Sequence, residues 1–131
     1  MPAIAEIAKM MQPLFPGLMG IEITEATKEK VTANMLVRPE LCTYGGVLHG
    51  GAFMAFADTI GAAGTAANLA EGQNTATIES KTNFISGCRS GTITAESKPI
   101  HKGKRTHVWE TRITDEKGKL LSVTTQTQMI V

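Results

Sequence analysis

One segment of this chain constrains the fold more than any other. Residues 50–69 (GGAFMAFADTIGAAGTAANL) are rich in alanine, contain no proline and are far longer than an ordinary strand. These features predict a single long helix. The sequence on both sides of it is typical of short strands. A sheet needs another element to cover its apolar face. We therefore expect an α+β fold in which an antiparallel sheet wraps around one long central helix.

Six strands are expected around this helix. Two precede it, at about residues 20–27 and 30–38. Four follow it, at 77–84, 91–100, 106–114 and 120–130, and the turn sequences GCRSG, HKGKR and DEKGK separate them. This spacing favours antiparallel hairpins with one buried face.

Several packing predictions accompany this outline. Residues 3–12 predict a short amphipathic helix that Pro13 and Pro16 end. Trp109 and Phe84 are expected in the core. In the last strand we expect one mixed-to-apolar face and one face in contact with water, the latter formed by Ser122, Thr124, Gln126 and Gln128. Small side chains of the long helix should permit close approach to the sheet, namely Gly61, Ala62, Ala63, Gly64, Ala66 and Ala67.

The length and composition of the chain predict one globular domain spanning residues 1–131. Hydrophobic residues make up 42% and charged residues 19%, which argues against disorder, and the formal net charge of +1 predicts no nucleic-acid partner. Cys42 and Cys88 fit no metal-ligand spacing and, without an export leader, indicate reduced thiols in the cytoplasm. A membrane span at 50–70 would place Asp58 near mid-bilayer at about 3 kcal/mol, so no membrane partner is expected.

Asp58 is the unusual residue of the long helix, because it interrupts an apolar run. A buried carboxylate costs several kcal/mol unless it is paired or hydrogen-bonded. It is either a structural acid, bonded to Thr59, Thr65 or a neighbouring subunit, or a base or nucleophile in an apolar site. The residues alone leave both interpretations open. The N-terminus of a helix can stabilise an oxygen that becomes negative, through its free N–H groups and its dipole.

Four features together resemble the hotdog fold of acyl-CoA thioesterases. They are the His49-Gly50-Gly51 turn, an acid nine residues after the histidine, and the later stretches ATIESKTNF and GKRTHVWE. In this order they are similar to the phenylacetic-acid-degradation (PaaI-like) branch, whose relatives include 4-hydroxybenzoyl-CoA thioesterase. The resemblance covers essentially the whole chain.

The resemblance implies hydrolysis of an acyl-CoA, with an aromatic or medium-chain acyl group, to the free acid and coenzyme A. It places the thioester carbonyl at the backbone N–H of Gly50. His49 would shape this turn and assist catalysis, and Gly51 would contribute to substrate binding. Asp58 would be the nucleophile or general base, and Thr77 a hydroxyl near the attacking water. A carboxylate and water suffice for this reaction, so no metal and no redox cofactor is expected.

The same resemblance draws attention to two other places. Six residues before the histidine many relatives have Asn or Gln, where this chain has Thr43, with a shorter side chain that offers only a hydroxyl. The basic run containing Lys102, Lys104 and Arg105 becomes a candidate for the phosphates of coenzyme A. Such a run is also common in a solvated hairpin.

Other functions stay open at this point. A hotdog enoyl-CoA hydratase or dehydratase would aim its histidine at the substrate. A non-catalytic acyl-CoA sensor would bind without turnover, and a purely structural interaction domain would leave Asp58 unexplained. A Cys42–His49 thiol nucleophile is disfavoured, since the sequence shows no residue that would orient Cys42.

Helix geometry adds an expectation about assembly. Gly50 and Asp58 are eight residues apart, which separates them by about 12 Å along one helix and about 80° around its axis. A single carbonyl cannot contact both groups of one helix. Two antiparallel copies related by a two-fold axis must then share each site. We expect at least a homodimer with shared active sites, and favour a homotetramer.

Overall fold

The sheet of this protein curls around one helix. The structure is a computed structural model that describes residues 4–131. Its helices are α1 (Ile4–Met11), α2 (Phe15–Met19) and α3 (Gly50–Ala66), with a 3-10 turn at Pro39–Leu41. Its strands are β1 (Glu22–Ala26), β2 (Val31–Val37), β3 (Thr75–Phe84), β4 (Gly91–Lys102), β5 (Thr106–Thr114) and β6 (Leu120–Ile130). The predicted α+β architecture is confirmed.

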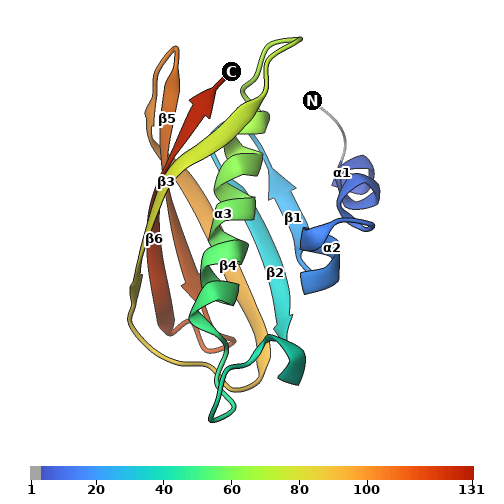
Figure 1. Cartoon of the computed structure of the whole chain (residues 1–131), viewed down its shortest axis with the longest axis vertical. Coiled ribbons are helices and arrows are strands. Elements are labelled where there is room, and N and C mark those ends of the chain that lie inside the picture. The colour runs from blue at the N-terminus through green and yellow to red at the C-terminus, as the bar shows by residue number, and fades with distance from the viewer. Residues whose placement is uncertain (1–3) are drawn as a thin grey trace.

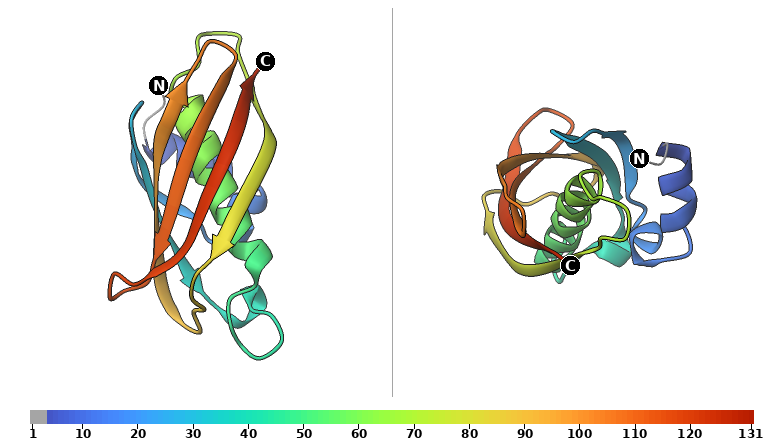
Figure 2. Two further views of the ribbon diagram at one scale, coloured as in Figure 1. Left: turned by 90° about the vertical axis from the view of Figure 1, so that its left-hand side faces the viewer. Right: turned by 90° about the horizontal axis from the view of Figure 1, so that it is seen from above.

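The six strands form one antiparallel sheet in the order β1-β2-β4-β5-β6-β3. Strands β1 and β3 are therefore its two edges. The concave face of the sheet surrounds α3, whereas α1 and α2 lie beyond β1 on the outside (Figure 1, Figure 2). This arrangement leaves one face of α3 uncovered by the sheet.

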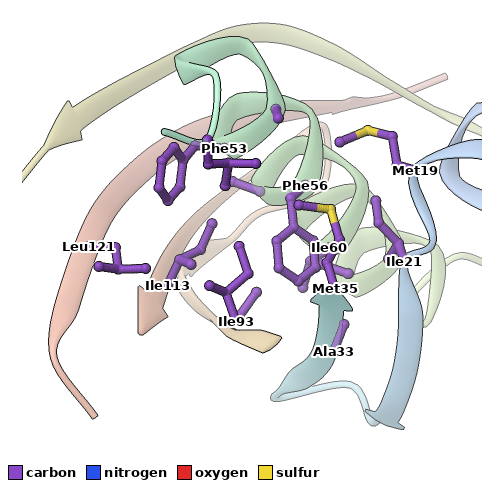
Figure 3. Packing of buried hydrophobic residues seen from close by; sticks show 14 of the residues in the cluster. Met19, Ile21, Ala33, Met35, Phe53, Phe56, Ile60, Ile93, Ile113 and Leu121 are labelled. Carbon is purple, nitrogen blue, oxygen red and sulfur yellow. The ribbon is translucent and has the colours of Figure 1, made fainter. Parts of the chain in front are cut away.

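The apolar core fills the space between α3 and the sheet. Phe53, Phe56 and Ile60 recur at helical spacing on the inner face of α3 and are 3% exposed or less. They belong to the same buried cluster as Met35, Ile93, Ile113 and Leu121 from the strands (Figure 3). Burial of each large apolar side chain stabilises the fold by about 1.5–3 kcal/mol.

Close approach of α3 to the sheet depends on two glycines. A Cβ atom at Gly61 would lie 2.0 Å from the amide nitrogen of Gln126, and one at Gly64 would lie 2.6 Å from the Trp109 ring. Buried Trp109 donates from Nε1 to Thr65 Oγ1 (2.9 Å). The prediction of close helix–sheet approach is correct for these glycines and wrong for the alanines. Four alanines instead line a groove between α3 and α1, namely Ala62, Ala63, Ala66 and Ala67.

The polar face of β6 points inward, contrary to the prediction from its alternation. Ser122, Thr124, Gln126 and Gln128 are all 0% exposed. The inner face of a sheet is usually apolar, and the alternation of β6 alone cannot tell which face is inside. Three of the four side chains bond to groups on α3 or β3, namely Thr124, Gln126 and Gln128. The buried Ser122 hydroxyl has no hydrogen-bond partner within residues 4–131.

Three smaller predictions also need correction. Phe84 is 53% exposed instead of buried. Pro16 does not end helical structure but lies in the first turn of α2, where its missing N–H costs nothing. The long helix ends at Ala66, three residues earlier than expected.

Within residues 4–131, no helix has the length and apolar character needed to cross a membrane.

Candidate active site

The N-terminus of α3 leaves one backbone donor free. His49 is the N-cap: its Nδ1 accepts from the Gly51 N–H (2.7 Å), and its carbonyl accepts from the N–H groups of Ala52 and Phe53. Among the first four N–H groups of the helix, only that of Gly50 has no partner within residues 4–131. The positive end of the helix dipole lies here as well, so this N–H can bind an oxygen that gains negative charge.

A phenylalanine lies beside this donor. The Phe84 ring would be 3.3 Å from a Cβ atom at Gly50, and it packs edge-on against Phe53 with ring centroids 6.1 Å apart. A side chain at position 50 would therefore crowd the free N–H. Phe84 was predicted in the core, but it lies at the end of the edge strand β3, beside the candidate site.

Asp58 lies on the outward face of α3, away from the apolar core. It shares that face with Gly51, Ala55 and Ala62, which follow one another at helical spacing. Its side chain is half-buried rather than enclosed, so the expected apolar surroundings are not complete in one chain. The small neighbours leave room for a substrate or another helix to approach the carboxylate.

Thr77 on β3 donates a hydrogen bond to Asp58, from Oγ1 to Oδ1 at 2.7 Å. A β-bulge between Thr77 and Glu79 makes this contact possible. Before the bulge Thr75 and Thr77 face α3, and after it Thr82 does so, hydrogen-bonding to Thr124 of β6. The bulge therefore changes which residues of β3 point inward, as bulges near active sites often do.

Two glutamines of β6 also contact this region, and sequence reasoning missed both. Gln128 Nε2 donates to Thr77 Oγ1 (2.5 Å), and Gln126 Nε2 donates to the backbone carbonyl of Asp58 (3.3 Å). Their alternation with threonines was visible in the sequence. A buried glutamine requires hydrogen-bond partners, so these amide groups were the signal that could have indicated polar contacts here.

The structure separates the remaining predicted site residues. Thr43 is exposed in the turn that leads to α3 and makes no side-chain hydrogen bond within residues 4–131. Lys104 and Arg105 are exposed in the β4–β5 hairpin, whereas Lys102 forms an ion pair with Glu29. This hairpin lies at the C-terminal end of α3, opposite to Gly50 (Figure 1).

The arrangement disfavours a thiol nucleophile. Cys42 Sγ donates to the Arg38 carbonyl (3.4 Å), and the Nδ1 atom of His49 is occupied by its bond to Gly51.

His107 lies in the buried layer behind the site, 4% exposed and opposite Gln128 in the register. Burial lowers the pKa of His107, and the charges of Lys102 and His101 lower it further.

Comparisons with known proteins show the family of this chain. Residues 45–122 match the family model described as "Thioesterase superfamily". The chain belongs to the thioesterase superfamily. It is 34% identical over 104 residues to a 1,4-dihydroxy-2-naphthoyl-CoA hydrolase from Listeria monocytogenes, covering 79% of this chain and 85% of that one.

Solved structures support the same conclusion for the fold of this thioesterase. A thioesterase from Haemophilus influenzae superposes with a TM-score of 0.95 at 29% identity, covering 100% of this chain and 92% of that one. A variant thioesterase from Pseudomonas aeruginosa gives the same TM-score at 28% identity, covering 99% and 94%. The predicted hotdog fold is confirmed, and the chain is a thioester hydrolase.

Proposed function

We propose that this thioesterase hydrolyses an acyl-CoA to the free acid and coenzyme A. The observation that supports this proposal is the pair of groups on α3: an unpartnered N–H at Gly50 and an outward carboxylate at Asp58 that Thr77 orients. The 34% identical relative named as a CoA-thioester hydrolase supports the choice of coenzyme A as the leaving group.

The proposed reaction uses only these groups and water. Asp58 removes a proton from a water molecule that attacks the carbonyl carbon, or attacks that carbon itself. In the second case loss of the thiolate leaves an acyl–aspartyl anhydride, and a water molecule then hydrolyses it to the free acid and the regenerated carboxylate. In both cases negative charge develops on the carbonyl oxygen, where the Gly50 N–H and the helix dipole stabilise it. The carbon–sulfur bond breaks as the carbonyl re-forms, and the thiolate leaves and takes up a proton. His49 contributes as the cap that holds the turn, with Gly51, in the shape that exposes the Gly50 N–H.

Each site is proposed to combine Gly50 of one chain with Asp58 of a second copy. The outward face of α3 carries small residues at Gly51, Ala55 and Ala62, so another helix can approach it closely. The neighbouring edge strand β3 has unpaired backbone groups on one side and exposes Ile78 (58%) and Phe84 (53%). An uncovered apolar edge of this kind favours pairing with a second sheet. A homodimer would cover both the outward face of α3 and the edge of β3, and a homotetramer would combine two such dimers.

The same assembly brings the basic hairpin to the site. Lys104 and Arg105 lie near the C-terminal end of α3, about 24 Å from Gly50 along the helix. One coenzyme A reaches both the Gly50 N–H and these cations more easily if they belong to two antiparallel chains. We propose that Lys104 and Arg105 bind the phosphates, whereas Lys102 is neutralised by Glu29.

The acyl group is proposed to occupy the groove between α1 and α3. This groove has a volume of about 320 Å³ and is lined mainly by apolar side chains, including Met11, Ala62 and Ala63. Thr59, which follows Asp58, and Thr75, two residues before Thr77, form part of its wall. The volume lies at the small end of ligand pockets, which favours an aromatic or medium-chain acyl group.

Two broader features complete the proposal. Residues 1–131 are proposed to form one thioesterase domain. A cytoplasmic location is supported by the free thiols of Cys42 and Cys88, since disulfides form in oxidising compartments.

Thiol release from a panel of aromatic and straight-chain acyl-CoAs tests the function, with Asp58→Asn as the diagnostic variant. Removal of a base or nucleophile should lower kcat about 100-fold or more while the fold is retained. Glu71→Gln removes an exposed carboxylate from a turn and should keep the wild-type rate. If Asp58→Asn kept a third of the wild-type rate, the assignment of Asp58 would be wrong. Binding without thiol release would indicate a sensor, and hydration of enoyl-CoA would indicate a hydratase.

A further inference from the structure

The inner face of β6 is polar where the sheet faces Asp58, and this needs a physical reason. A buried amide or hydroxyl costs free energy unless it finds hydrogen-bond partners. Gln128 is 0% exposed, and both ends of its amide have partners: Thr75 on the oxygen and Thr77 on the nitrogen. Gln128 does not touch Asp58 itself, so any effect on the carboxylate must pass through Thr77.

The hydrogen bonds form one chain from Thr75 to Asp58, and the carboxylate at its end determines which group donates in each bond. Ionised Asp58 can only accept, so the single hydroxyl hydrogen of Thr77 must point to Oδ1 (2.7 Å). The Thr77 oxygen is then free to accept, and Gln128 must present its NH₂ group to it (2.5 Å). The Gln128 oxygen consequently faces Thr75, whose hydroxyl must donate to it (2.9 Å). Every donor in the chain points toward the carboxylate.

A different group at position 128 would break this order. An acceptor there would compete with Asp58 for the one hydrogen of Thr77. An apolar side chain would leave Asp58 as the one group that orients this hydroxyl, with no donor on the Thr77 oxygen to oppose its rotation away from the carboxylate. Thr75 bonds to the oxygen end of the Gln128 amide and limits its movement, and β6 places the glutamine directly opposite Thr77 in the sheet register. The glutamine thus supplies a donor at the one place where only a donor keeps the Thr77 hydrogen on Asp58.

Gln126 holds the other end of the same residue. Its Nε2 donates to the backbone carbonyl of Asp58 (3.3 Å), and it packs where Gly61 leaves room. Asp58 therefore has one β6 glutamine on its backbone and another acting on its carboxylate through Thr77.

We propose that Gln128 is a positioning residue for the thioesterase reaction: it fixes the direction of the Thr77 hydroxyl so that this group donates to Asp58. The role rests on the proposed function, because it assumes that Asp58 is the base or nucleophile. It predicts a loss in kcat, with little change in KM, because Gln128 lies behind Thr77 and does not contact the substrate.

The test compares Gln128→Met with a matched control on the same strand. Methionine keeps the length and removes both hydrogen-bonding groups, and kcat should fall about ten-fold. Thr124→Val removes another buried β3–β6 side-chain bond, that of Thr124 to Thr82 (2.7 Å), away from Asp58. It should lower the melting temperature but keep the wild-type kcat. An equal loss of kcat in both variants would overturn the proposal.

A double-mutant cycle then asks whether the effect passes through Thr77. In a Thr77→Val background, Gln128→Met should cost no further kcat, because the hydroxyl to be oriented is gone. A further ten-fold loss there would show that Gln128 acts by another route and would refute the proposal.

Thr75→Val gives an independent result if Gln128→Met does not fold. It removes the donor that orients the glutamine amide, from a half-buried position on an edge strand. With a short acyl-CoA as the substrate, kcat of this variant should fall two- to three-fold. An unchanged kcat would count against the role of Gln128. Loss of groove contacts would instead raise KM. Failure of the proposed function has a different signature, namely equal rates for the wild type and Asp58→Asn.

Discussion

Two inactive variants of this thioesterase should restore activity to each other when they assemble in one dimer. The first is Asp58→Asn. The second is Gly50→Pro, which removes the free backbone N–H. Proline is favoured at the first position of a helix, and the extended backbone of His49 (ψ 137°) suits a residue that precedes proline. No hydrogen bond within residues 4–131 is lost. The Phe84 ring, 3.3 Å from the new Cβ atom, must shift slightly, and its 53% exposure leaves room for this, so both variants should fold.

The expected yield follows from the geometry of α3. Gly50 and Asp58 are about 12 Å apart along one helix and about 80° apart around it, too far for both to contact one carbonyl. If each site takes one group from each chain, a mixed dimer holds one intact site and one doubly damaged site. Equal amounts of the two variants, unfolded and refolded together, give half mixed dimers. About a quarter of wild-type activity should return.

The assay is thiol release from an acyl-CoA after co-refolding, with each variant refolded alone as the control. Different affinity tags on the two variants allow mixed dimers to be captured and counted. If captured mixed dimers are inactive, each site lies within one chain and the shared-site geometry is refuted. If only monomers form, the proposed dimer is itself wrong.

Three other perturbations test separate parts of the proposal. Replacing Lys104 and Arg105 together with alanine should raise KM for acyl-CoA about ten-fold and leave kcat unchanged; a similar loss on a short thioester without the nucleotide would contradict phosphate binding. Ala63→Phe should fill the groove and lower kcat/KM for medium-chain substrates about ten-fold more than for acetyl-CoA; an equal loss on both would place the acyl group elsewhere. Because burial lowers the pKa of His107, the unfolded state binds a proton more readily, so unfolding free energy should fall as pH drops below about 6.5. Urea melts of wild type and His107→Gln should show a smaller pH dependence in the variant; identical slopes would exclude His107 as its source.

The order of the six strands and the long helix was predictable because each has a strong local signal, whereas the short helix α2 was not predicted. The long alanine-rich segment has helical length and no proline, and the strands end at glycine-containing turns. The relative positions of the proposed site residues on α3 were predictable for a related reason. His49, Gly50 and Asp58 have a fixed spacing on one helix, so their relative positions follow from the sequence alone.

The residues that the sequence could not place depend on pairing between distant strands. Thr77 reaches Asp58 because a bulge shifts the register of β3 against β6. Local alternation in β3 does not reveal where such a bulge lies. The inward direction of Gln126 and Gln128 has the same origin, since a strand with polar residues on one face gives no sign that another polar group lies opposite. Phe84 was misplaced because an aromatic residue at the end of a strand is typical of a core, whereas β3 is an edge.

The position of Asp58 connects these observations. An acid on the outward face of a helix needs no partner if the face meets water, yet Thr77 and, behind it, Gln128 are committed to it. The side chains around it on that face are small, which gives up apolar contact that larger residues would provide. The missing apolar contact lowers the stability of a lone chain, and the bonds toward Asp58 hold an acid that water alone could solvate. Both features become favourable if a second α3 covers this face and brings a free Gly50 N–H to the carboxylate, because the same contact then excludes water and completes the site.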